Sequence, residues 1–402
     1  MKVWSRHACH NETPAALSAL ADGLSDAEKN AQLVFAFYNC VHEAAPLHGF
    51  LSATFPDAAF IGGSSNGGVM LDDGLHDAGG VGLLIFNDPD GDFGVGAREK
   101  GAAPADAAEQ ALRDALESAD CVDELPDMIW VYQSPGQEEA VIEGLRRIVG
   151  DRCPIIGGSS ADNDLSGAWT QIAPAGTFTD AVVVAALFPS SGVSYAFQGG
   201  YEPNGRFGVA SQVADASGAN DGQAPGRIIR QIDGRPAAAV YNEWIEGGID
   251  DVLDEGGVIL GHTTSHPIAL EAGVADGVEQ YVLVHPERVL PDGSLTTFAN
   301  IPPDATLHCM TGDESKLVDR AGRVAEQAVA QLDGTSAAAG LIVYCAGCRM
   351  KIGEQVAALP ETVRSALGNI PFLGCFTFGE QGAIVDKNAH GNLMISVVAF
   401  GG

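Results

Sequence analysis

The sequence has few positively charged residues for its length. Lys and Arg together number 21 against 53 Asp and Glu, so the formal net charge is −32 at pH 7. A surface of this charge repels phosphate backbones and anionic lipid headgroups, so nucleic acid and membrane surfaces are not expected as partners. Acidic composition of this kind is ordinary in proteins adapted to salt or to high solubility, and it says little about a ligand.

The sequence also lacks a long apolar run and a secretion signal. Its longest apolar stretch, Ala181–Phe188, is far shorter than the ~20 residues that span a bilayer. The first residues, MKVWSRHACHNETPAAL, contain no apolar segment of the kind found in signal peptides. The eight cysteines are scattered, which fits reduced thiols better than a disulfide framework. We therefore expect a cytoplasmic protein.

A chain of 402 residues is too long for one ordinary hydrophobic core, so two domains are expected. The segment 192–226 is rich in Gly, Ser, Asn and Gln, and the boundary is placed within it. This divides the chain into an N-terminal lead-in (1–30), a first domain (31–205) and a second domain (206–402).

A strand–helix–strand–strand pattern occurs three times. The copies comprise Leu33–Tyr38, Glu43–Ala53, Phe60–Ile61 and Val81–Phe86; then Met128–Tyr132, Gln137–Val149, Pro154–Ile156 and Val182–Phe188; and then Leu341–Tyr344, Glu354–Leu367, Pro371–Leu373 and Leu393–Phe400. Such repetition indicates internal duplication. The sequence therefore predicts an α/β fold of two domains, with mixed sheets built from duplicated strand–helix–strand–strand units.

Each copy carries a Gly-rich polar turn after its second strand. We call residues 62–68 the first turn, 157–162 the second and 374–380 the third. Glycines let backbone N–H groups approach a ligand, and hydroxyls donate and accept hydrogen bonds. The turns are therefore predicted to line one ligand pocket, the alternative being tight turns without a ligand. The candidates are Ser64, Ser65, Asn66, Ser159, Ser160, Asp162, Thr377, Gly379 and Glu380.

The first turn also matches the G-x-S-x-G nucleophile elbow from Gly63 to Gly67. That elbow joins a strand to a helix. The sequence that follows, from Val69 to Gly74, is not helical, so serine hydrolysis is disfavoured.

Cys345 and Cys348 form a C-x-x-C at a strand–helix junction, as in thiol redox enzymes. The sequence has no second such pair to complete a zinc site, and Gly353 indicates that the helix does not begin at Cys348. Arg349 follows, permanently charged and able to hold a carboxylate with two hydrogen bonds. Its expected partner is a ligand or Glu380, and we expect these two residues to lie close together.

Glu380 is the only acid retained at its position among the three turns. Gly68 replaces it in the first turn, and Asn163 falls near its place in the second.

His262 and His266 stand four residues apart in a segment that Pro267 and the intervening Thr residues favour as extended chain. Two side chains at this spacing in a strand lie about 13 Å apart, too far for one metal ion. They are either ordinary polar residues of a β segment or, for one of them, an axial ligand of haem.

The order of these motifs resembles the FIST family. The third turn, preceded by Cys345 and Arg349, is similar to its C-terminal domain; the first turn resembles its N-terminal domain, and Ile232–Ala237 its middle segment. The resemblance covers roughly residue 30 to the end. It implies an intracellular sensory module that binds a small ligand, and it adds Cys345 and Arg349 to the site. A subset of the family binds haem and senses nitric oxide.

We therefore expect a sensor of an amino acid or similar small anion. The resemblance implies a signalling partner such as a histidine kinase or a cyclic-dinucleotide enzyme. The alternatives are a haem-binding nitric oxide sensor, a thiol redox enzyme using Cys345 and Cys348, and a purely structural interaction module. An enzyme is disfavoured, and haem is the only cofactor that the resemblance implies.

Overall fold

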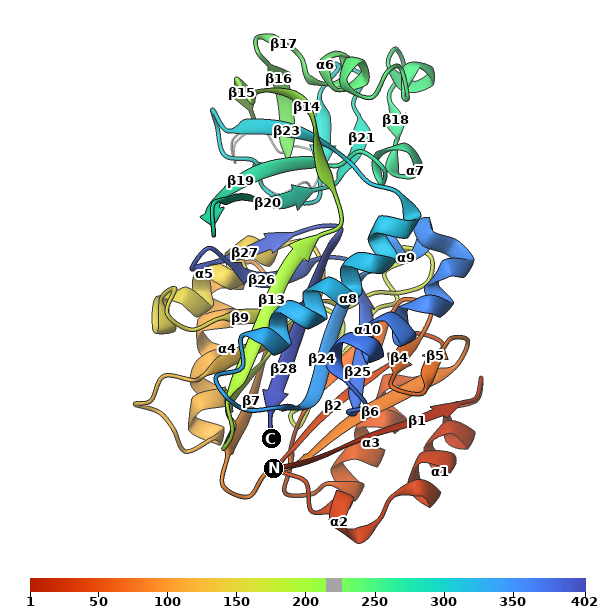
Figure 1. Cartoon of the computed structure of the whole chain (residues 1–402), viewed down its shortest axis with the longest axis vertical. Coiled ribbons are helices and arrows are strands. Elements are labelled where there is room, and N and C mark those ends of the chain that lie inside the picture. Colours follow the sequence, from red (N-terminus) through yellow and green to blue (C-terminus); the bar gives the residue numbers. More distant parts are fainter. Residues whose placement is uncertain (215–225) are drawn as a thin grey trace.

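The computed structural model describes residues 1–214 and 226–402 (Figure 1). It consists of a large domain of three six-stranded sheets with a smaller domain above it, formed by residues 202–311. The predicted α/β class, with mixed sheets and repeated units, is confirmed. The repeat is longer than the sequence indicated, because a strand and a helix precede each predicted unit.

Each copy runs through a leading strand, a helix, a strand, a second helix, a strand, a hairpin and a closing strand. The first copy comprises β1 (Lys2–Cys9), α1 (Thr13–Gly23), α2 (Asp26–Lys29), β2 (Leu33–Asn39), α3 (Ala44–Thr54), β3 (Ala59–Ser65), β4 (Val69–Leu71), β5 (Gly74–His76) and β6 (Gly80–Asn87). The second comprises β7 (Asp92–Glu99), α4 (Pro104–Ser118), β8 (Met128–Gln133), α5 (Glu138–Val149), β9 (Ile155–Ser159), β10 (Gln171–Ala173), β11 (Gly176–Phe178) and β12 (Ala181–Phe188). Strand β1 was not predicted from the sequence.

The third copy is interrupted by the smaller domain after its leading strand. It comprises β13 (Val193–Gly199), α8 (Glu314–Ala330), β24 (Ala337–Cys345), α9 (Ala346–Ile352), a 3₁₀ helix (Gly353–Ala358), α10 (Leu359–Leu367), β25 (Phe372–Thr377), β26 (Glu380–Ile384), β27 (Lys387–Gly391) and β28 (Met394–Gly401). Asp313 caps α8 as predicted, since its carboxylate accepts a hydrogen bond from the backbone N–H of Lys316 at 2.9 Å.

The three sheets share one strand order. The first sheet is β1-β6-β2-β3-β10-β11, the second β7-β12-β8-β9-β26-β27 and the third β13-β28-β24-β25-β4-β5. In each sheet the two central strands are parallel, and the other pairings are antiparallel. The terminal hairpin of each sheet comes from a different copy: the second copy supplies the first sheet, the third supplies the second, and the first supplies the third. The exchange is therefore cyclic and closed.

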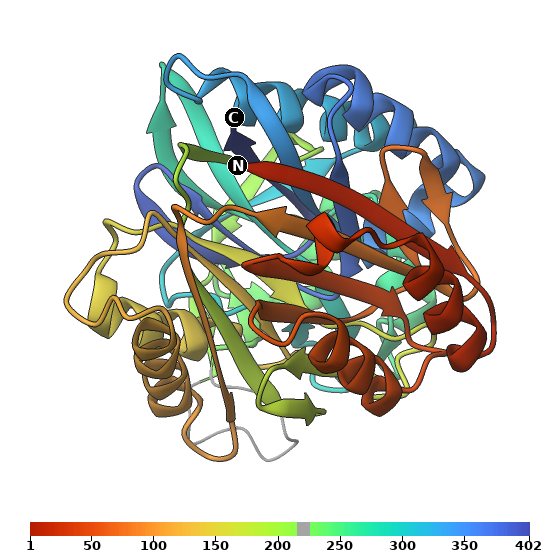
Figure 2. The same cartoon turned by 90° about the horizontal axis from the view of Figure 1, so that it is seen from below.

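The inner faces of the three sheets pack against one another, and helices cover their outer faces (Figures 1 and 2). Aromatic pairs join the sheets across this inner core: Phe35 lies 5.5 Å from Trp130, and Phe86 lies 4.8 Å from Phe400, between ring centroids. The buried face of α4 is the predicted one, made by Ala108, Ala111, Leu112, Ala115 and Leu116.

The smaller domain is inserted between β13 and α8. It comprises β14 (Glu202–Val209), β15 (Gln212–Val213), β16 (Ile228–Ile232), β17 (Arg235–Pro236), α6 (Ala237–Trp244), a 3₁₀ helix (Asp250–Val252), β18 (Gly257–Val258), α7 (Leu260–Thr263), β19 (Ile268–Ala275), β20 (Val278–Val284), β21 (Pro286–Val289), β22 (Leu295–Thr297) and β23 (Thr306–Thr311). Its described strands form two antiparallel sheets with a core of their own. We call it the inserted domain.

Helix α4 packs directly on the backbone of β7, so we predict that a methyl group between them destabilises the protein. A Cβ at Gly96 would lie 2.0 Å from the carbonyl oxygen of Ala111. Gly96→Ala should lower the free energy of unfolding by about 1–3 kcal/mol, because the helix must move outward. Gly49→Ala, within α3 and with nothing near its Cβ, should leave it unchanged or raise it. Equal effects of the two variants in denaturant unfolding would contradict this packing.

Candidate functional site

The three Gly-rich turns meet at the centre of the large domain and hydrogen-bond to one another. The first turn contacts the third, because the N–H of Asn66 donates to the carbonyl of Phe376 (3.0 Å) and the N–H of Phe376 donates to Ser65 Oγ (2.8 Å). It contacts the second through the N–H of Ala161, which donates to the carbonyl of Ser64 (3.1 Å). The three turns therefore lie side by side, although they were predicted to line a ligand pocket and that role stays a prediction.

Hydrogen bonds between the second and third turns complete a closed ring of the three turns. The N–H of Ser159 donates to the carbonyl of Gly379 (2.8 Å), and the N–H of Phe378 donates to the carbonyl of Ser159 (3.1 Å). Ser160 is also fully buried and accepts a hydrogen bond from the side chain of Gln171 at 2.6 Å. The predicted turn residues thus hold the three copies together, and their role toward a ligand stays a prediction.

Asp162 organises the loop of the second turn. Its carboxylate is fully buried and accepts hydrogen bonds from the backbone N–H groups of Leu165, Gly167 and Ala168 at 2.7–2.9 Å. Its own carbonyl accepts from the side chain of Asn66 (2.7 Å). These bonds give the Asp162 carboxylate a structural part in the ring.

The predicted pairing of Arg349 with Glu380 is wrong. Arg349 donates to the carboxylate of Asp77 (2.6 Å) and to the side-chain oxygen of Asn66 (3.2 Å), and it lies over the ring of Phe376. The partner comes from the hairpin of the first copy, which the sequence could not place beside the third. Because Asp77 is half-exposed, the Arg349–Asp77 pair lies at the outer edge of the three hydrogen-bonded turns.

Glu380 is fully buried without a cationic partner among the described residues. Its carboxylate accepts hydrogen bonds from Thr377 Oγ1 (2.8 Å) and from the N–H of Met394 (3.0 Å). Burial, followed by the nearby thiol of Cys345, raises the pKa of Glu380 well above its usual value. A group that favours its neutral form is suited to this cation-free position.

The counterparts of Glu380 differ from those inferred from the sequence. The first residue of each exchanged hairpin lies opposite the same position of its host sheet: Val69 opposite Cys375, Gln171 opposite Gly63 and Glu380 opposite Gly158. Val69 and Gln171 are therefore equivalent to Glu380, rather than Gly68 and Asn163. The error arose because the three turns differ in length.

Cys345 and Cys348 are both buried and unpaired. Helix α9 begins at Ala346, so Cys348 lies within the helix rather than at its first residue. The helix ends before Gly353, whose φ is 54°. Burial and the neighbouring Cys348 raise the pKa of Cys345 well above its usual value. Because the thiolate is the reactive form, these surroundings disfavour the redox alternative.

His262 and His266 of the inserted domain lie in a short helix and the turn after it, rather than in extended chain. His262 is exposed on α7. His266 is partly buried, and its Nδ1 has no hydrogen-bond partner among the described residues. Haem ligation by either one stays a prediction, for which a Soret band in the absorption spectrum is the direct test.

A buried cluster of charged residues, not predicted from the sequence, joins the inserted domain to the second copy. The guanidinium of Arg227 contacts the carboxylates of Glu138 (2.8 Å) and Glu139 (2.7 Å). Glu139 also contacts His390 Nδ1 (3.0 Å), and Glu138 accepts a hydrogen bond from Ser159 Oγ (2.9 Å). We call Glu138, Glu139, Arg227 and His390 the buried charge cluster.

The electrostatics of this cluster depend on its cations. Burial by itself would raise the pKa of Glu138, but His390 and Arg227 lower it to about 2. The pKa of Glu139 is lowered by the same two neighbours. No local signal in the sequence marks these residues, because acidic residues are common at the start of any helix and His390 is 251 positions from Glu139.

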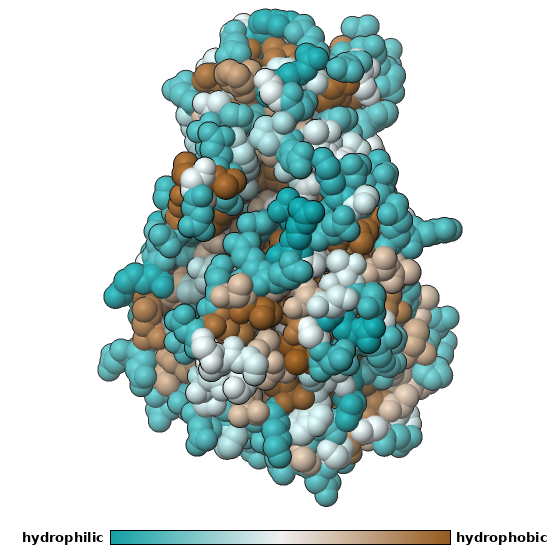
Figure 3. Space-filling view, in the orientation of Figure 1, coloured by the Kyte–Doolittle hydropathy of each residue, from teal (hydrophilic) through white to brown (hydrophobic). Residues whose placement is uncertain are grey.

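A cavity of about 240 Å³ opens where the inserted domain meets the large domain. It is lined by side chains of both domains: Gln198, Tyr201, Glu202, Pro203, Val278, Glu279, Gln280, Tyr281, Leu283, Met310, Arg320 and Ile384, together with Gly199. Figure 3 shows the narrow waist of the molecule at this level. We call it the waist cavity.

Arg320 of α8 is the notable cation of the waist cavity. It donates to Gln198 Oε1 (3.1 Å), and no described carboxylate forms an ion pair with it. Partial burial and the neighbouring Arg323 lower its pKa, against an opposing effect of the Glu202 carboxylate. By contrast, Glu202 is paired with Lys316 (3.0 Å), and Glu279 accepts a hydrogen bond from Tyr281 (2.6 Å).

Comparison with known proteins gives two family matches and distant structural similarities. Residues 32–235 match the FIST N domain and residues 237–383 match the FIST C domain. No curated protein matches the chain. Cyanuric acid hydrolase from A. caulinodans is 10% identical with a TM-score of 0.37, and a second cyanuric acid hydrolase structure is 12% identical with a TM-score of 0.34. Each similarity covers 99% of both chains, but at these TM-scores neither indicates a shared activity.

None of the described helices is both long and apolar enough to cross a membrane.

We predict that the buried charge cluster depends on Arg227. Arg227→Met should lower the free energy of unfolding by about 3–5 kcal/mol, because it leaves the buried carboxylate of Glu138 and the partly buried one of Glu139 without their cation. Arg235→Met removes an exposed ion pair with Glu243 and should leave the stability nearly unchanged. Denaturant unfolding of the two variants gives the comparison, and similar losses would show that the cluster contributes no more than a surface pair.

The same cluster predicts a loss of stability in acid. The pKa of Glu138 is about 2 in the folded protein against 4.5 ordinarily, so the unfolded state binds more protons between these values. The stabilisation should be present above pH 4.5 and disappear as the pH falls toward 2. The Tm of the wild type should therefore fall more steeply over this range than that of a Glu138→Gln/Arg227→Met double variant. Parallel pH profiles would contradict the prediction.

Proposed function

The chain belongs to the FIST family, and on this premise we propose that it is a sensory module that binds a small anionic ligand, such as an amino acid, and signals through a partner protein. FIST domains are associated with small-ligand sensing and signal transduction. The observation that carries the proposal is Arg320, a cation that forms no ion pair among the described residues, in a cavity between two domains.

The ligand class follows from the groups around the waist cavity. A guanidinium without a carboxylate partner binds a ligand carboxylate with two parallel hydrogen bonds. Glu279 lines the same cavity, and its carboxylate can accept from an ammonium group of the ligand. The volume of about 240 Å³ suits a molecule of amino-acid size and lies below the ~300 Å³ at which pockets for drug-sized ligands begin. An amino acid therefore satisfies both charges.

The position of the waist cavity supports a way to transmit binding. Gln198 lies on the strand that leads out of the large domain, and Met310 lies on the strand that leads back. A ligand that contacts both domains favours the arrangement in which those contacts are made. Ligand binding would thereby select one orientation of the inserted domain.

The surface of the inserted domain supports a role in partner binding. Among the described residues, half of the large hydrophobic side chains that are exposed belong to this domain: Phe207, Val209, Val258, Val274 and Val278. Apolar side chains exposed on one domain are available to a protein partner. We propose that the partner protein contacts this domain.

The proposal predicts that an amino acid stabilises the wild type through Arg320. Each proteinogenic amino acid is added at millimolar concentration, and the Tm is measured. A ligand at a hundred times its Kd stabilises the folded state by about 2.7 kcal/mol, which raises the Tm by several degrees. Arg320→Gln should remove this shift, because glutamine keeps a hydrogen-bonding side chain but lacks the charge.

Arg323→Gln is the matched control. Arg323 lies on the same helix, is exposed and does not line the cavity, so its variant should keep the full shift. The proposal fails if no amino acid stabilises the wild type, or if folded Arg320→Gln responds as the wild type does.

A further inference from the structure

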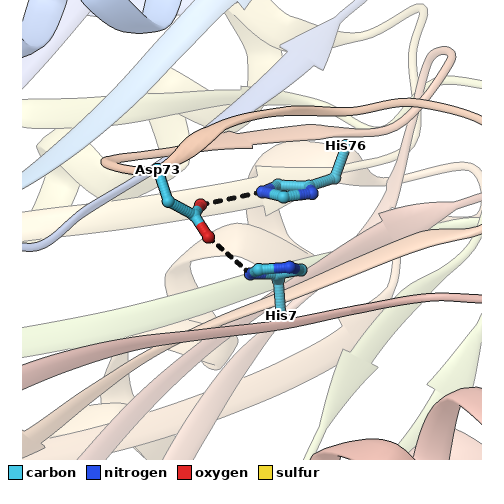
Figure 4. Close-up of side chains that lie close together, drawn as sticks. All are labelled: His7, Asp73 and His76. Atoms are coloured by element: carbon cyan, nitrogen blue, oxygen red, sulfur yellow. Dashed lines mark hydrogen bonds and ion pairs between the residues drawn. The ribbon is translucent and has the colours of Figure 1, made fainter.

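A cluster of two histidines and an aspartate lies on the surface of the large domain, away from the waist cavity. His7 comes from β1, and Asp73 and His76 come from the β4–β5 hairpin (Figure 4). His7 Nδ1 lies 3.2 Å from one oxygen of Asp73, and His76 Nε2 lies 2.8 Å from the other. The two imidazoles stack with centroids 3.6 Å apart. One carboxylate thus faces two ring nitrogens.

The fold creates this cluster by bringing two sheet edges together. Strand β1 is an edge of the first sheet, whereas β5 is an edge of the third sheet, to which the hairpin is exchanged. The two edges are also joined by a hydrogen bond from Ser5 Oγ to the carboxylate of Asp72. A second side-chain contact thus links the strand and the hairpin that carry the cluster.

We propose that His7, Asp73 and His76 bind a Zn²⁺ ion. Candidate ligand atoms of all three side chains lie within 4.8 Å of one another. Two imidazole nitrogens and one carboxylate oxygen are a donor set typical of zinc, whereas Ca²⁺ and Mg²⁺ prefer oxygen ligands alone. Three protein ligands leave a coordination position open to water.

The side chains need only small movements to reach coordination distances. Zinc binds nitrogen and oxygen ligands at about 2.0–2.2 Å, so a bound ion would replace the present contacts between the ring nitrogens and Asp73. The stacked rings must tilt apart so that each nitrogen points at the ion. The side chains are accessible enough to do so, with exposed fractions of 33% for His7, 15% for His76 and 52% for Asp73.

The buried charge cluster is a poorer candidate for a metal. Glu138, Glu139 and His390 also have ligand atoms within 4.8 Å of one another. There, however, the guanidinium of Arg227 already contacts both carboxylates. Its positive charge neutralises theirs and would repel a metal ion. The surface cluster contains no such cation.

Zinc binding is tested on the full-length protein without a polyhistidine tag, after treatment with a chelator. Titration calorimetry with Zn²⁺ should show one site per chain, and Zn²⁺ but not Mg²⁺ should raise the Tm. His7→Gln and His76→Gln should each weaken zinc binding at least about tenfold, since loss of even an outer partner of a metal ligand typically costs 10–100-fold. His10→Gln, an exposed histidine at the end of the same strand, should bind as the wild type does.

Co²⁺ gives an independent measurement that does not depend on stability. Bound tetrahedrally, it should produce visible absorption in the wild type and in His10→Gln, but not in His76→Gln. Circular dichroism establishes that each variant is folded. The proposal is overturned if the wild type binds no Zn²⁺, or if folded His7→Gln and His76→Gln both bind it with wild-type affinity.

Discussion

The closed exchange of three β-hairpins is the constraint on which the rest of the structure depends. Each sheet of the large domain ends in a hairpin that another copy supplies, so no copy completes its own sheet. An uncovered sheet edge exposes unpaired backbone groups, and the exchange covers one edge of each central strand pair. The three Gly-rich turns lie where the chain passes from one sheet to the exchanged hairpin of the next. This explains why their polar atoms hydrogen-bond to one another. The three copies of the repeat are thereby joined into one domain.

The same exchange determines where charged side chains can meet. It carries Asp77 to Arg349 and His76 to the edge beside β1, and it brings His390 next to helix α5 of another copy. The contact between Arg227 and two buried glutamates then attaches the inserted domain to the second copy. A buried ion pair of this kind is weak evidence for stability. The waist cavity lies at the boundary between these same domains.

The strongly negative net charge of the protein makes the environment of Arg320 in the waist cavity unusual. In a protein with 53 acidic and 21 basic residues, most arginines find a carboxylate nearby. Arg320 contacts an amide instead, beside a second arginine and within a cavity. The acidic surface of the protein repels anions from solution. The positive charge of Arg320 offsets this repulsion locally, so an anion is favoured at this position. The proposed ligand site therefore rests on an arginine that departs from this pattern and lines a cavity.

The sequence by itself determined the class of the fold, the three copies and the helix faces, because these depend on local periodicity and turn residues. The face of α4 and the Asp313 cap were predicted correctly for this reason. It also indicated that the Gly-rich turns act together. Only the tertiary structure decided which copy completes which sheet, and with it the partners of Arg349 and Glu380. Contacts between residues 77 and 349, or 7 and 76, leave no periodic pattern in the sequence, because they arise from strand exchange across the whole chain.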